Sequence, residues 1–530
     1  MLSRTVLTFS NSQWDPNTLF ISKVDEVYIK IEAESPIKQE LSDFFTFTVP
    51  NAKFTPAYKN RMWDGKIRLY NLNTRKIYSG LLPYIEGFCN EREYKIEYQN
   101  DVTSAHSFSK NEAMGFIKEI NSKLKPREYQ LKSFIHCVRN KRALIVSPTA
   151  SGKSYIIYML SKWYGPVEKK LIIVPTISLV NQMKSDFISY GYDKNRIHCI
   201  TAGVEKQADE DVVISTWQSI YKLPKSYFEQ YNVVIGDECH LYKAKSLTSI
   251  MTKLTNAPYR FGFTGTLDGM ETNKLVVEGL FGKVKQYVTT KELIDKKTLA
   301  NFKIKCLVLK HDEADSKLIS SAKYKEEMDY LVSNQERNNF IKNLAMSLKG
   351  NSLLLFQYVE KHGKTLYEMC RKEANKNRKV FFVYGGVGAD ERESIRQITE
   401  SETNAIIVAS FGTFSTGINI RNLHNILFSS PTKSRIRNLQ SIGRGLRVGD
   451  NKNKAVLYDI ADDLRYKSKV NYTLEHFAER IKLYNEEQYQ TALMLGLIGK
   501  YLFRNEIATL KTIQLKDYKK LKSEELKDNF

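Results

Sequence analysis

A short polar loop near residue 150 combines the residue types that bind a nucleoside triphosphate. The segment SPTASGKS (147–154) follows the apolar run RALIV (142–146) and fits the pattern G-x-x-x-x-G-K-[ST], except that Ser147 stands at the first glycine. Backbone N–H groups of such a loop cradle phosphates, Lys153 reaches the β- and γ-phosphates, and the hydroxyl of Ser154 binds Mg²⁺. The alternative is a chance GKS after a buried strand. The expected ATP-binding residues of the loop are Pro148, Thr149, Ala150, Ser151, Gly152, Lys153 and Ser154.

A second apolar run ends in two adjacent carboxylates. In VVIGDECH (233–240), Asp237 is suited to hold Mg²⁺ through water, and Glu238 is suited to orient and polarise the attacking water. The end of a strand is where α/β sheets present ligand groups. The alternative is an ordinary acidic turn. A metal site at Cys239 and His240 is not expected, because no second pair stands at ligand spacing.

The order of these segments resembles the superfamily 2 helicases and translocases, and especially the recombination helicases of tailed bacteriophages. The resemblance covers roughly residues 35–465 and rests on several motifs in the right order. It implies that PREYQ (126–130) reads the adenine, with Gln130 on the base edge and Tyr129 and Arg127 beside it. Without the resemblance, the same segment indicates only the start of an amphipathic helix.

The resemblance also assigns QSIGRGLRVGD (440–450) to the motif that completes the nucleotide site. Arg444 and Arg447 lie three residues apart, about one helical turn, so both side chains can point to one site. Arginine fingers supply positive charge to the phosphate oxygens of the transition state. With Lys153 and Glu238, these arginines form the expected catalytic set. The alternative is a basic helix end in contact with solvent or DNA.

Other segments match motifs that contact the nucleic-acid strand, where small and hydroxyl residues suit phosphate contacts. They are VPTISLVNQ (174–182), STWQS (215–219), FTGT (263–266) and SFGTFSTGINI (410–420). By resemblance, the candidate strand contacts are Thr176, Thr216, Gln218 and Thr413, the link between hydrolysis and strand binding is Thr264 with Thr266, and a further nucleotide-site residue is Gly417. Trp217 is a candidate for stacking on a base, but a buried tryptophan after a strand is an equally good interpretation.

Basic and aromatic residues are interleaved in a short N-terminal segment. Residues 51–80 contain seven lysines and arginines against one acid, whereas the fifty residues before them are net acidic. Because basic residues bind phosphates and aromatic rings stack on bases, we expect Trp63, Lys66 and Arg68 to contact nucleic acid. The stretch FTPAYKNRMWDGKIRLY (54–70) resembles the N-terminal domain of the same phage helicases, which implies a role on branched DNA. The alternative is a structural β-domain with a core tryptophan and solvated lysines.

The apolar runs that lead into these motifs predict the fold. Short runs alternate with amphipathic helical stretches from about residue 120 to 295, and the same rhythm returns from 300 to 465. This alternation is typical of βαβ units around a parallel sheet. We therefore expect an α/β protein with two tandem RecA-like lobes, a small α+β N-terminal domain and a helical C-terminal extension. The expected boundaries are 1–115 for the N-terminal accessory domain that binds nucleic acid, 116–298 for lobe 1, 299–466 for lobe 2 and 467–530 for the extension.

Composition narrows the class of protein further. The chain has 530 residues, of which 42% are hydrophobic and 26% charged, so a largely disordered chain is excluded. Its net charge of +22 favours a polyanionic partner, and nucleic acid more than a membrane. No apolar run approaches the ~20 residues of a membrane span, and we see no signal peptide. We expect a cytoplasmic protein, in the host cell if a phage encodes it. The six dispersed cysteines argue against a zinc ribbon or a disulfide scaffold.

Together, the motifs predict a DNA helicase or translocase that uses ATP and Mg²⁺ and acts on branched DNA. The resemblance implies branch migration and fork regression in phage recombination, repair and replication. The alternatives are an RNA helicase, a translocase that tracks on duplex DNA without separating it, and a nucleic-acid-binding ATP switch without productive turnover. The expected partners are branched or duplex DNA, then single-stranded DNA and a single-strand-binding protein, and we expect a monomer.

Overall fold

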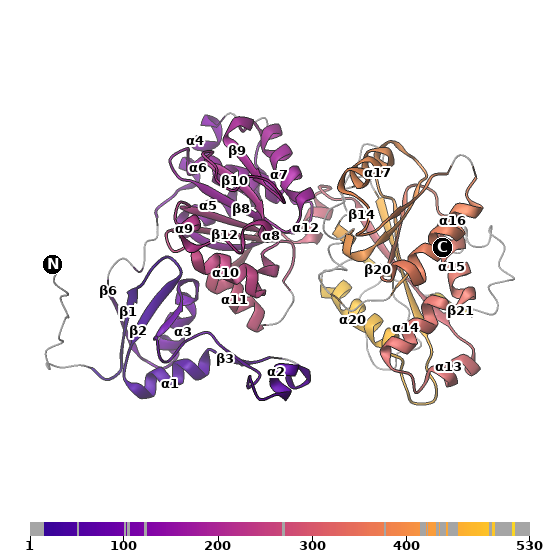
Figure 1. The fold of residues 1–530 in the computed structure, drawn as a ribbon, viewed down its shortest axis with the longest axis horizontal. Coiled ribbons are helices and arrows are strands. Elements are labelled where there is room, and N and C mark those ends of the chain that lie inside the picture. Colours follow the sequence, from indigo (N-terminus) through magenta and orange to yellow (C-terminus); the bar gives the residue numbers. More distant parts are fainter. Residues whose placement is uncertain are drawn as a thin grey trace. The chain divides into compact units, whose positions relative to one another are not determined.

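The structure is a computed structural model, and it describes two compact units (Figure 1). One unit comprises Met1–Val146 and Ser154–Tyr287, and the other comprises Ser147–Lys153 and Val288–Phe530. The described residues are 15–49, 52–99, 102, 106–120, 124–267, 271–375, 378–413, 420, 422–430, 434, 441–443, 454–486, 490–492 and 511–514. Among these residues, no helix is both long enough and apolar enough to cross a membrane.

The N-terminal module, residues 15–99, is a small sheet with two longer helices. Its elements are β1 (Thr18–Lys23), β2 (Tyr28–Glu32), α1 (Ser35–Phe44), β5 (Lys76–Tyr78), η2 (Ser79–Leu81), α3 (Leu82–Glu91) and β6 (Lys95–Gln99), in addition to the hairpin described next. The strand order is β5-β2-β1-β6, with β1 antiparallel to β2 and parallel to β6. Alternate residues of β1 and β2, such as Leu19, Ile21 and Ile31, are fully buried, which is the period of a strand with one covered face.

A hairpin inserted into this module carries the basic and aromatic segment. β3 (Thr46–Thr48) pairs antiparallel with β4 (Lys66–Arg68). Between them in the chain lie η1 (Ala52–Phe54) and α2 (Pro56–Lys59). We call residues 46–68 the basic hairpin. In Figure 1, α2 stands apart from the four-stranded sheet, so the hairpin is a projection of the module.

Lobe 1 is a parallel sheet of seven strands between two layers of helices. Its strands are β7 (Arg142–Val146), β8 (Lys170–Val174), β9 (Ile197–Ile200), β10 (Val212–Thr216), β11 (Val233–Asp237), β12 (Tyr259–Thr264) and β13 (Val284–Gln286), in the order β13-β7-β12-β11-β8-β10-β9. The main helices are α4 (Lys110–Glu119), α5 (Glu128–Asn140), α6 (Lys153–Trp163), α7 (Ile177–Tyr190), α8 (Trp217–Ile220), α9 (Lys225–Phe228), α10 (Lys245–Lys253) and α11 (Glu271–Phe281), with the shorter turns η3 (Lys194–Arg196) and η4 (Cys239–Lys243).

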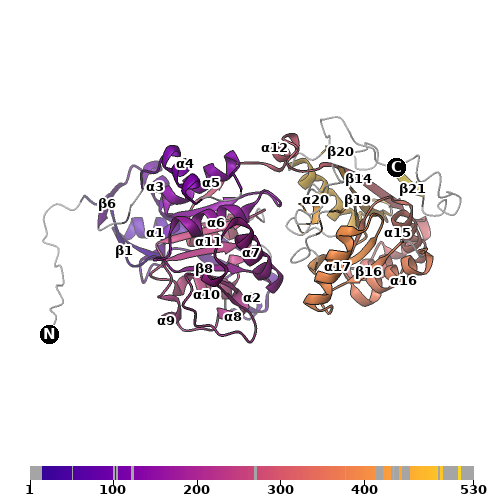
Figure 2. The same cartoon turned by 90° about the horizontal axis from the view of Figure 1, so that it is seen from above.

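Alternate residues of each strand of lobe 1 enter two separate cores. In β7, Ala143 and Ile145 pack with residues of α5, α6 and α7, whereas Leu144 packs with residues of α8, α10 and α11 (Figure 2). A parallel sheet that is covered on both faces needs apolar residues at successive positions. This is why the runs that lead into the motifs, such as LIIV (171–174), are apolar throughout.

Lobe 2 repeats the parallel architecture, which confirms the predicted pair of RecA-like sheets. Its strands are β14 (Asn301–Lys310), β15 (Ser352–Phe356), β16 (Val380–Val383), β17 (Ile406–Ser410), β18 (Asn425–Phe428) and β19 (Lys454–Asp463), in the order β16-β17-β15-β18-β19-β14. The helices are α12 (Thr290–Asp295), α13 (Glu313–Ile319), α14 (Tyr324–Ser333), α15 (Gln335–Ser347), the π-helical turn η5 (Val359–Gly363), α16 (Lys364–Glu373), α17 (Ala389–Ser401) and α20 (Tyr472–Glu486).

The prediction of a helical C-terminal extension is correct for α20 and wrong for the other described parts of the extension. β20 (Gln490–Ala492) and β21 (Lys511–Gln514) are strands, and both pair in parallel with β14. Without them β14 is an edge strand, whose unpaired N–H and C=O groups attract a further strand. The need to cover this edge therefore outweighs the local helical pattern.

Lobe 2 buries a polar network at the carboxyl ends of its strands. Arg337 of α15 donates from Nε and Nη2 to the two carboxylate oxygens of Asp462, at 2.8 and 2.9 Å. His311 Nε2 lies 3.0 Å from the same carboxylate. Burial raises the pKa of Asp462, but the charges and hydrogen bonds of Arg337 and His311 together outweigh it and hold the pKa well below its usual range. This network therefore keeps a charged pair inside the lobe.

His362 lies in the same region without a charged partner. Its Nδ1 is 3.1 Å from Ser430 Oγ, and its Nε2 is 3.1 Å from Asn338 Oδ1. Burial, followed by the charge of Arg337, lowers the pKa of His362 to about 3. The ring is therefore neutral in the folded lobe at neutral pH.

We predict that lobe 2 loses stability between pH 7.5 and pH 5 because of His362. The unfolded chain binds a proton near pH 6.5 and the folded chain does not, so the free energy of unfolding falls by about 2 kcal/mol at pH 5. Urea titrations at both pH values, with oxidation of the buried Met328 as the report on lobe 2, measure this. His362→Gln removes the pH dependence and His106→Gln, at an exposed position, retains it. An equal pH slope in both variants contradicts the prediction.

Candidate nucleotide site and nucleic-acid surface

Three adjacent strands of lobe 1 bring the predicted motifs to one edge of the sheet. β12 lies between β7 and β11, with Thr264 opposite Val146 and Phe263 opposite Asp237. Because parallel strands end on the same side, the loop that follows Val146, the carboxylates after Ile235 and the FTGT segment start from a common edge.

The phosphate-binding loop has the backbone that an anion cradle requires. Ala150 and Gly152 have φ values of +66° and +81°, so residues in the left-handed region alternate with others along the loop. Such an alternation turns successive N–H groups toward one point. The loop residues thus fit the triphosphate that the sequence predicts.

Ser147 closes the loop at the position where the general pattern has glycine. Its Oγ is 2.7 Å from Ser151 Oγ, and its carbonyl oxygen accepts a 3.2 Å hydrogen bond from Lys153 Nζ. Serine therefore replaces the flexibility of glycine with a hydroxyl that pairs across the loop. The carbonyl of Ser147 holds the Lys153 ammonium within the loop, where a triphosphate needs a cation.

The hydroxyl predicted to bind Mg²⁺ has a partner that the sequence did not identify. Ser154 Oγ lies 3.0 Å from the hydroxyl of Tyr190, at the end of α7. The two residues are 36 positions apart, and no spacing rule connects them. Tyr190 thus orients the Ser154 side chain at the start of α6, and Ser154 remains chemically suited to hold the metal ion.

Asp237 and Glu238 stand at the end of β11, as the sequence predicts. Glu238 has a φ of +50°, an uncommon value for a residue with a side chain, and its N–H donates to Asp237 Oδ1 at 3.0 Å. Backbone strain of this kind is typical of functional positions. The sharp turn separates two successive carboxylates, so that they can take different roles.

His240 connects the carboxylates to the FTGT segment. Its Nδ1 lies 2.9 Å from Thr264 Oγ1 and 3.4 Å from Glu238 Oε2, and the ring is buried. Thr264 Oγ1 in turn donates to the carbonyl of Thr266 at 2.9 Å. Among the described residues, no group of three or more potential ligands forms a metal site. His240 is thus a polar link between two motifs.

The predicted adenine element combines both interpretations of PREYQ. Gln130 Oε1 accepts the N–H of Arg127 at 2.8 Å, so Gln130 caps the start of α5. Arg127 Nη1 donates to the hydroxyl of Tyr129 at 3.1 Å. The helix start is therefore present, and it groups the three predicted residues together. Contact with the base stays a prediction.

The predicted strand contacts of lobe 1 start two helices. Thr176 caps α7, with its Oγ1 3.4 Å from Leu179 N, and Thr216 Oγ1 lies 2.9 Å from Ser219 Oγ before α8. Gln218 Nε2 donates to the carbonyl of Pro175 at 3.4 Å and so joins the two segments. Trp217 is partly buried against the lobe 1 core, with its ring 5.8 Å from Tyr221, which favours the packing interpretation over base stacking.

Lobe 2 shows less of its predicted site. Thr413 is buried, and its Oγ1 accepts a 2.8 Å hydrogen bond from Ser410 Oγ. This bond orders the end of β17, so Thr413 has a structural role. Its contact with the nucleic-acid strand stays a prediction. Gly417, Arg444 and Arg447 lie outside the described residues, and their roles stay predictions.

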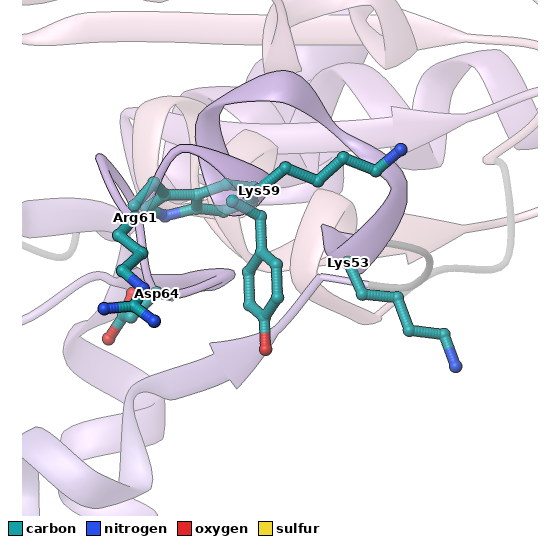
Figure 3. A pocket seen from close by; sticks show the side chains of 6 residues that line it. Lys53, Lys59, Arg61 and Asp64 are labelled. Carbon is teal, nitrogen blue, oxygen red and sulfur yellow. The ribbon is translucent and has the colours of Figure 1, made fainter.

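The basic hairpin surrounds a shallow cleft of about 540 Å³ (Figure 3). Two of the three residues predicted to bind nucleic acid are partly engaged: Trp63 Nε1 donates to Lys66 O at 2.8 Å, and Arg68 Nη2 donates to Asp64 Oδ2 at 2.5 Å. The hydrogen bond from Arg68 holds the pKa of Asp64 below its usual range. Lys66 is exposed.

The tip of the basic hairpin offers a better surface than the predicted residues. The exposed side chains at the tip include three large apolar ones and three cations. They are Phe54, Tyr58, Met62, Lys53, Lys59 and Arg61. Met62 is 80% and Phe54 is 64% exposed, which is unusual for such side chains. Figure 3 shows Lys53 and Lys59 extending away from the ribbon and Arg61 beside Asp64. The exposed apolar residues were a signal in the sequence, since they interrupt any strand or helix period.

Family models match most of the chain in three successive stretches. Residues 20–99 match "DNA helicase UvsW, N-terminal", residues 91–269 match "Type III restriction enzyme, res subunit", and residues 336–449 match "Helicase conserved C-terminal domain". These stretches contain, in order, the N-terminal module, the lobe 1 motifs and the lobe 2 motifs.

Comparisons with whole proteins agree with these matches. The chain is 32% identical to the ATP-dependent DNA helicase uvsW of Enterobacteria phage T4 over 88% of this chain and 97% of that protein. It is 26% identical to the DNA 3'-5' translocase XPB2 of Sulfurisphaera tokodaii over 79% and 95% of the two chains. The structure of Saccharomyces cerevisiae Dbp5 bound to RNA and ADP BeF3 matches with a TM-score of 0.52 at 11% identity, over 78% of this chain and 96% of that one, which shows a shared fold.

The two parallel lobes and the motifs on their strand ends define a superfamily 2 helicase. Within that class the identity to the phage T4 protein extends over nearly its whole length and includes the N-terminal module. The chain belongs to the UvsW family.

We predict that Glu238→Gln, Lys153→Ala and Arg447→Ala each abolish ATP turnover and leave the melting profile unchanged. The loss of a positioned base alone costs roughly 10²–10⁴-fold in rate. Steady-state phosphate release at saturating ATP measures this, and binding of a fluorescent ATP analogue separates turnover from affinity. Glu229→Gln is the matched control, because Glu229 is exposed on lobe 1 and precedes the start of β11, whereas Glu238 follows its end. Normal hydrolysis in any of the three variants shows that the site is assigned wrongly.

Proposed function

We propose that this protein is an ATP-driven DNA motor that acts on branched DNA, through branch migration and fork regression, in recombination, repair and replication. The observation that carries the proposal is the combination of lobe 1 motifs with a basic, partly apolar projection on the N-terminal module. The membership in the UvsW family supports it, because the phage T4 relative is named as an ATP-dependent DNA helicase.

The lobe 1 residues divide the work of hydrolysis. The loop of residues 148–152 cradles the phosphates through its N–H groups, and Lys153 neutralises the charge on the transferred phosphoryl group. Ser154 and Asp237 would hold Mg²⁺, which when bound polarises the phosphates. Glu238 orients the attacking water and takes its proton.

His240 gives this site a way to sense the nucleic acid. It contacts both Glu238 and Thr264, so a shift of the FTGT segment changes the position of the general base Glu238. We propose that Arg444 and Arg447 of lobe 2 complete the charge around the phosphates when ATP draws the lobes together. Strand contacts by Thr176, Thr216 and Thr413 on alternate lobes then convert closure into stepping.

The basic hairpin would engage the branch point. Its cations bind phosphates, and the exposed rings of Phe54 and Tyr58 present faces on which unpaired bases stack. Branched DNA offers both partners at one place, because strands separate at the junction. Trp63 stabilises the hairpin through its hydrogen bond to Lys66 O, and so supports DNA binding without stacking on a base.

We further propose that the protein works as a monomer in the cytoplasm of the host cell, with single-strand-binding protein as a partner on exposed strands. These proposals rest on the phage origin of the relative and on the nature of branched DNA, which exposes single strands.

Junction and forked DNA are expected to stimulate ATP hydrolysis more than any other polymer. The hairpin and both lobes engage such a substrate at once, whereas a single strand reaches only part of the surface. Steady-state hydrolysis is measured without nucleic acid and with single-stranded DNA, duplex DNA, a four-way junction and RNA at equal nucleotide concentration. Stimulation mainly by RNA identifies an RNA helicase instead. Binding of ATP without turnover on any polymer identifies a switch.

Removing charge from the hairpin is expected to flatten the salt dependence of DNA binding. Each lost phosphate contact reduces the slope of log K against log salt by about 1. Lys59→Ala with Arg61→Ala should therefore lower the slope by about 2, and Lys66→Ala with Arg68→Ala by about 1, because Arg68 already pairs with Asp64.

Fluorescence anisotropy with forked DNA between about 50 and 200 mM salt measures these slopes. Lys361→Ala with Lys364→Ala is the matched control, because it removes two cations that pair with Asp329 and Glu360 on lobe 2. A slope for the hairpin variants equal to that of this control returns the hairpin to a structural role.

A further inference from the structure

Helix α11 has two packed faces that connect the N-terminal module to the catalytic strands. On one face Leu275 enters the core of the N-terminal module, together with Leu81 and Ile85. On the other face Val277, Leu280 and Phe281 enter a core of lobe 1. Val276 and Tyr78 pack against both cores. The hydrophobic interior is thus continuous from the module into the lobe.

The contact between α11 and the module is close enough to exclude side chains. Gly80 of η2 faces Gly279 of α11. A Cβ at Gly279 would lie 2.8 Å from Tyr78 Cδ2, and a Cβ at Gly80 would overlap the carbonyl oxygen of Glu278. Both positions therefore require glycine because of close approach, and the two backbones meet without an intervening layer.

A buried carboxylate fixes the orientation of this contact. Glu278 has no exposed surface, and its Oε2 accepts a 2.7 Å hydrogen bond from the hydroxyl of Tyr84 in α3. Its Oε1 accepts a 2.8 Å hydrogen bond from Val284 N at the start of β13. Burial and the bond to Glu278 raise the pKa of Tyr84, so this hydroxyl stays a donor. Removing one of the two donors would leave an oxygen of this buried carboxylate without a hydrogen bond, which costs free energy.

A second clamp lies between the module and the strand that leads to the phosphate loop. Arg142, the first residue of β7, donates from Nη2 to the carbonyl of Glu26 at 2.5 Å and to its carboxylate at 3.1 Å. The N–H of Glu26 donates to Thr255 O of lobe 1 at 3.1 Å. Two separate sets of bonds, in addition to a shared core, thus hold the module in one orientation.

The far end of α11 lies against the strands that carry the catalytic groups. The ring of Phe281 covers Gly236 and Gly262, where a Cβ would come within 2.8 and 2.9 Å of it. Gly236 directly precedes Asp237, and Gly262 stands two residues before Thr264. A displacement of α11 therefore presses on the ends of β11 and β12, since packed interiors transmit strain.

We propose that the joint between η2 and α11, centred on Gly80 and Gly279, makes the N-terminal module and lobe 1 one mechanical body and transmits the load of bound DNA to Asp237, Glu238 and Thr264. This proposal rests on the proposed function in one respect, namely that the basic hairpin binds branched DNA. The module then moves with lobe 1 through each ATP cycle. Gly80, Gly279 and Glu278 are positioning residues, because they act through α11 and touch no substrate.

Gly80→Ala in the full chain tests the joint. Gly87→Ala is the matched control: Gly87 lies in α3 of the same module, and a Cβ there meets no atom within 4 Å. We expect Gly80→Ala to increase hydrogen exchange in peptides of both η2 and α11. We also expect it to lower fork-stimulated ATP hydrolysis about tenfold, a coupling of common size. Basal hydrolysis without DNA should change by less than about twofold, because the strand ends themselves keep their residues.

A second pair of variants separates the joint from general damage to the fold. Tyr84→Phe removes one donor to Glu278, and should reduce fork stimulation in the same direction as Gly80→Ala. Glu278→Gln keeps an acceptor for Val284 N and a partner for Tyr84, and should retain stimulation. If Glu278→Gln loses as much stimulation as Tyr84→Phe, the role assigned to the hydrogen bonds of Glu278 is wrong.

The two proposals fail in different ways. If no DNA stimulates the wild-type protein, the proposed function is wrong, and the exchange data still decide whether η2 and α11 open together. If hydrogen exchange and fork stimulation in Gly80→Ala equal those in Gly87→Ala, the joint tolerates a side chain at position 80. This result overturns the inference. If exchange rises in Gly80→Ala and fork stimulation stays the same, the joint exists but transmits no load, which also overturns it.

Discussion

The parallel register of β7, β12 and β11 positions the described catalytic groups of lobe 1. Thr264 stands opposite Val146, and Phe263 opposite Asp237, so the phosphate loop, the carboxylates and the FTGT segment leave the sheet together. The register is held by burial on both faces. A slip of one residue in β7 would exchange Leu144 with Ala143 and Ile145 between two cores of different shape. The geometry of the site is therefore a consequence of hydrophobic packing beneath it.

The same strands must also leave space. Gly236 and Gly262 interrupt strands whose neighbouring positions carry larger side chains, and the ring of Phe281 of α11 fills the volume that they free. This arrangement places a helix from outside the motif set directly behind Asp237 and Thr264. Because α11 also shares a core with the N-terminal module, the module is an integral part of lobe 1 in structural terms. The module contacts lobe 1 through a shared core, through the hydrogen bond between Tyr84 and Glu278 and through the hydrogen bond from Arg142 to Glu26. Such contacts are typical of the interior of one domain and not of two domains joined by a flexible linker.

The basic hairpin presents less free positive charge than its composition indicates. Asp64 forms an ion pair with Arg68, so part of the positive potential is cancelled locally. The remaining cations stand around exposed Phe54 and Met62 at the tip. Phosphate attraction and apolar contact therefore coincide at one end of the hairpin. In lobe 2, by contrast, charge is buried: Asp462 and Arg337 form an ion pair inside the lobe.

The sequence alone determined the parallel lobes, the phosphate loop and the paired carboxylates. Each of these depends on a pattern of four to ten consecutive residues, in which local burial and turn chemistry repeat wherever the pattern occurs. Only the tertiary structure decided what these groups touch. The partner of Ser154 is Tyr190, His240 joins Glu238 to Thr264, Trp217 packs into the core, and two C-terminal segments become strands on β14. The joint of Gly80 and Gly279 joins residues that lie far apart in the chain, on two different elements. Such contacts depend on how whole elements pack, and no local pattern encodes the distance between two elements.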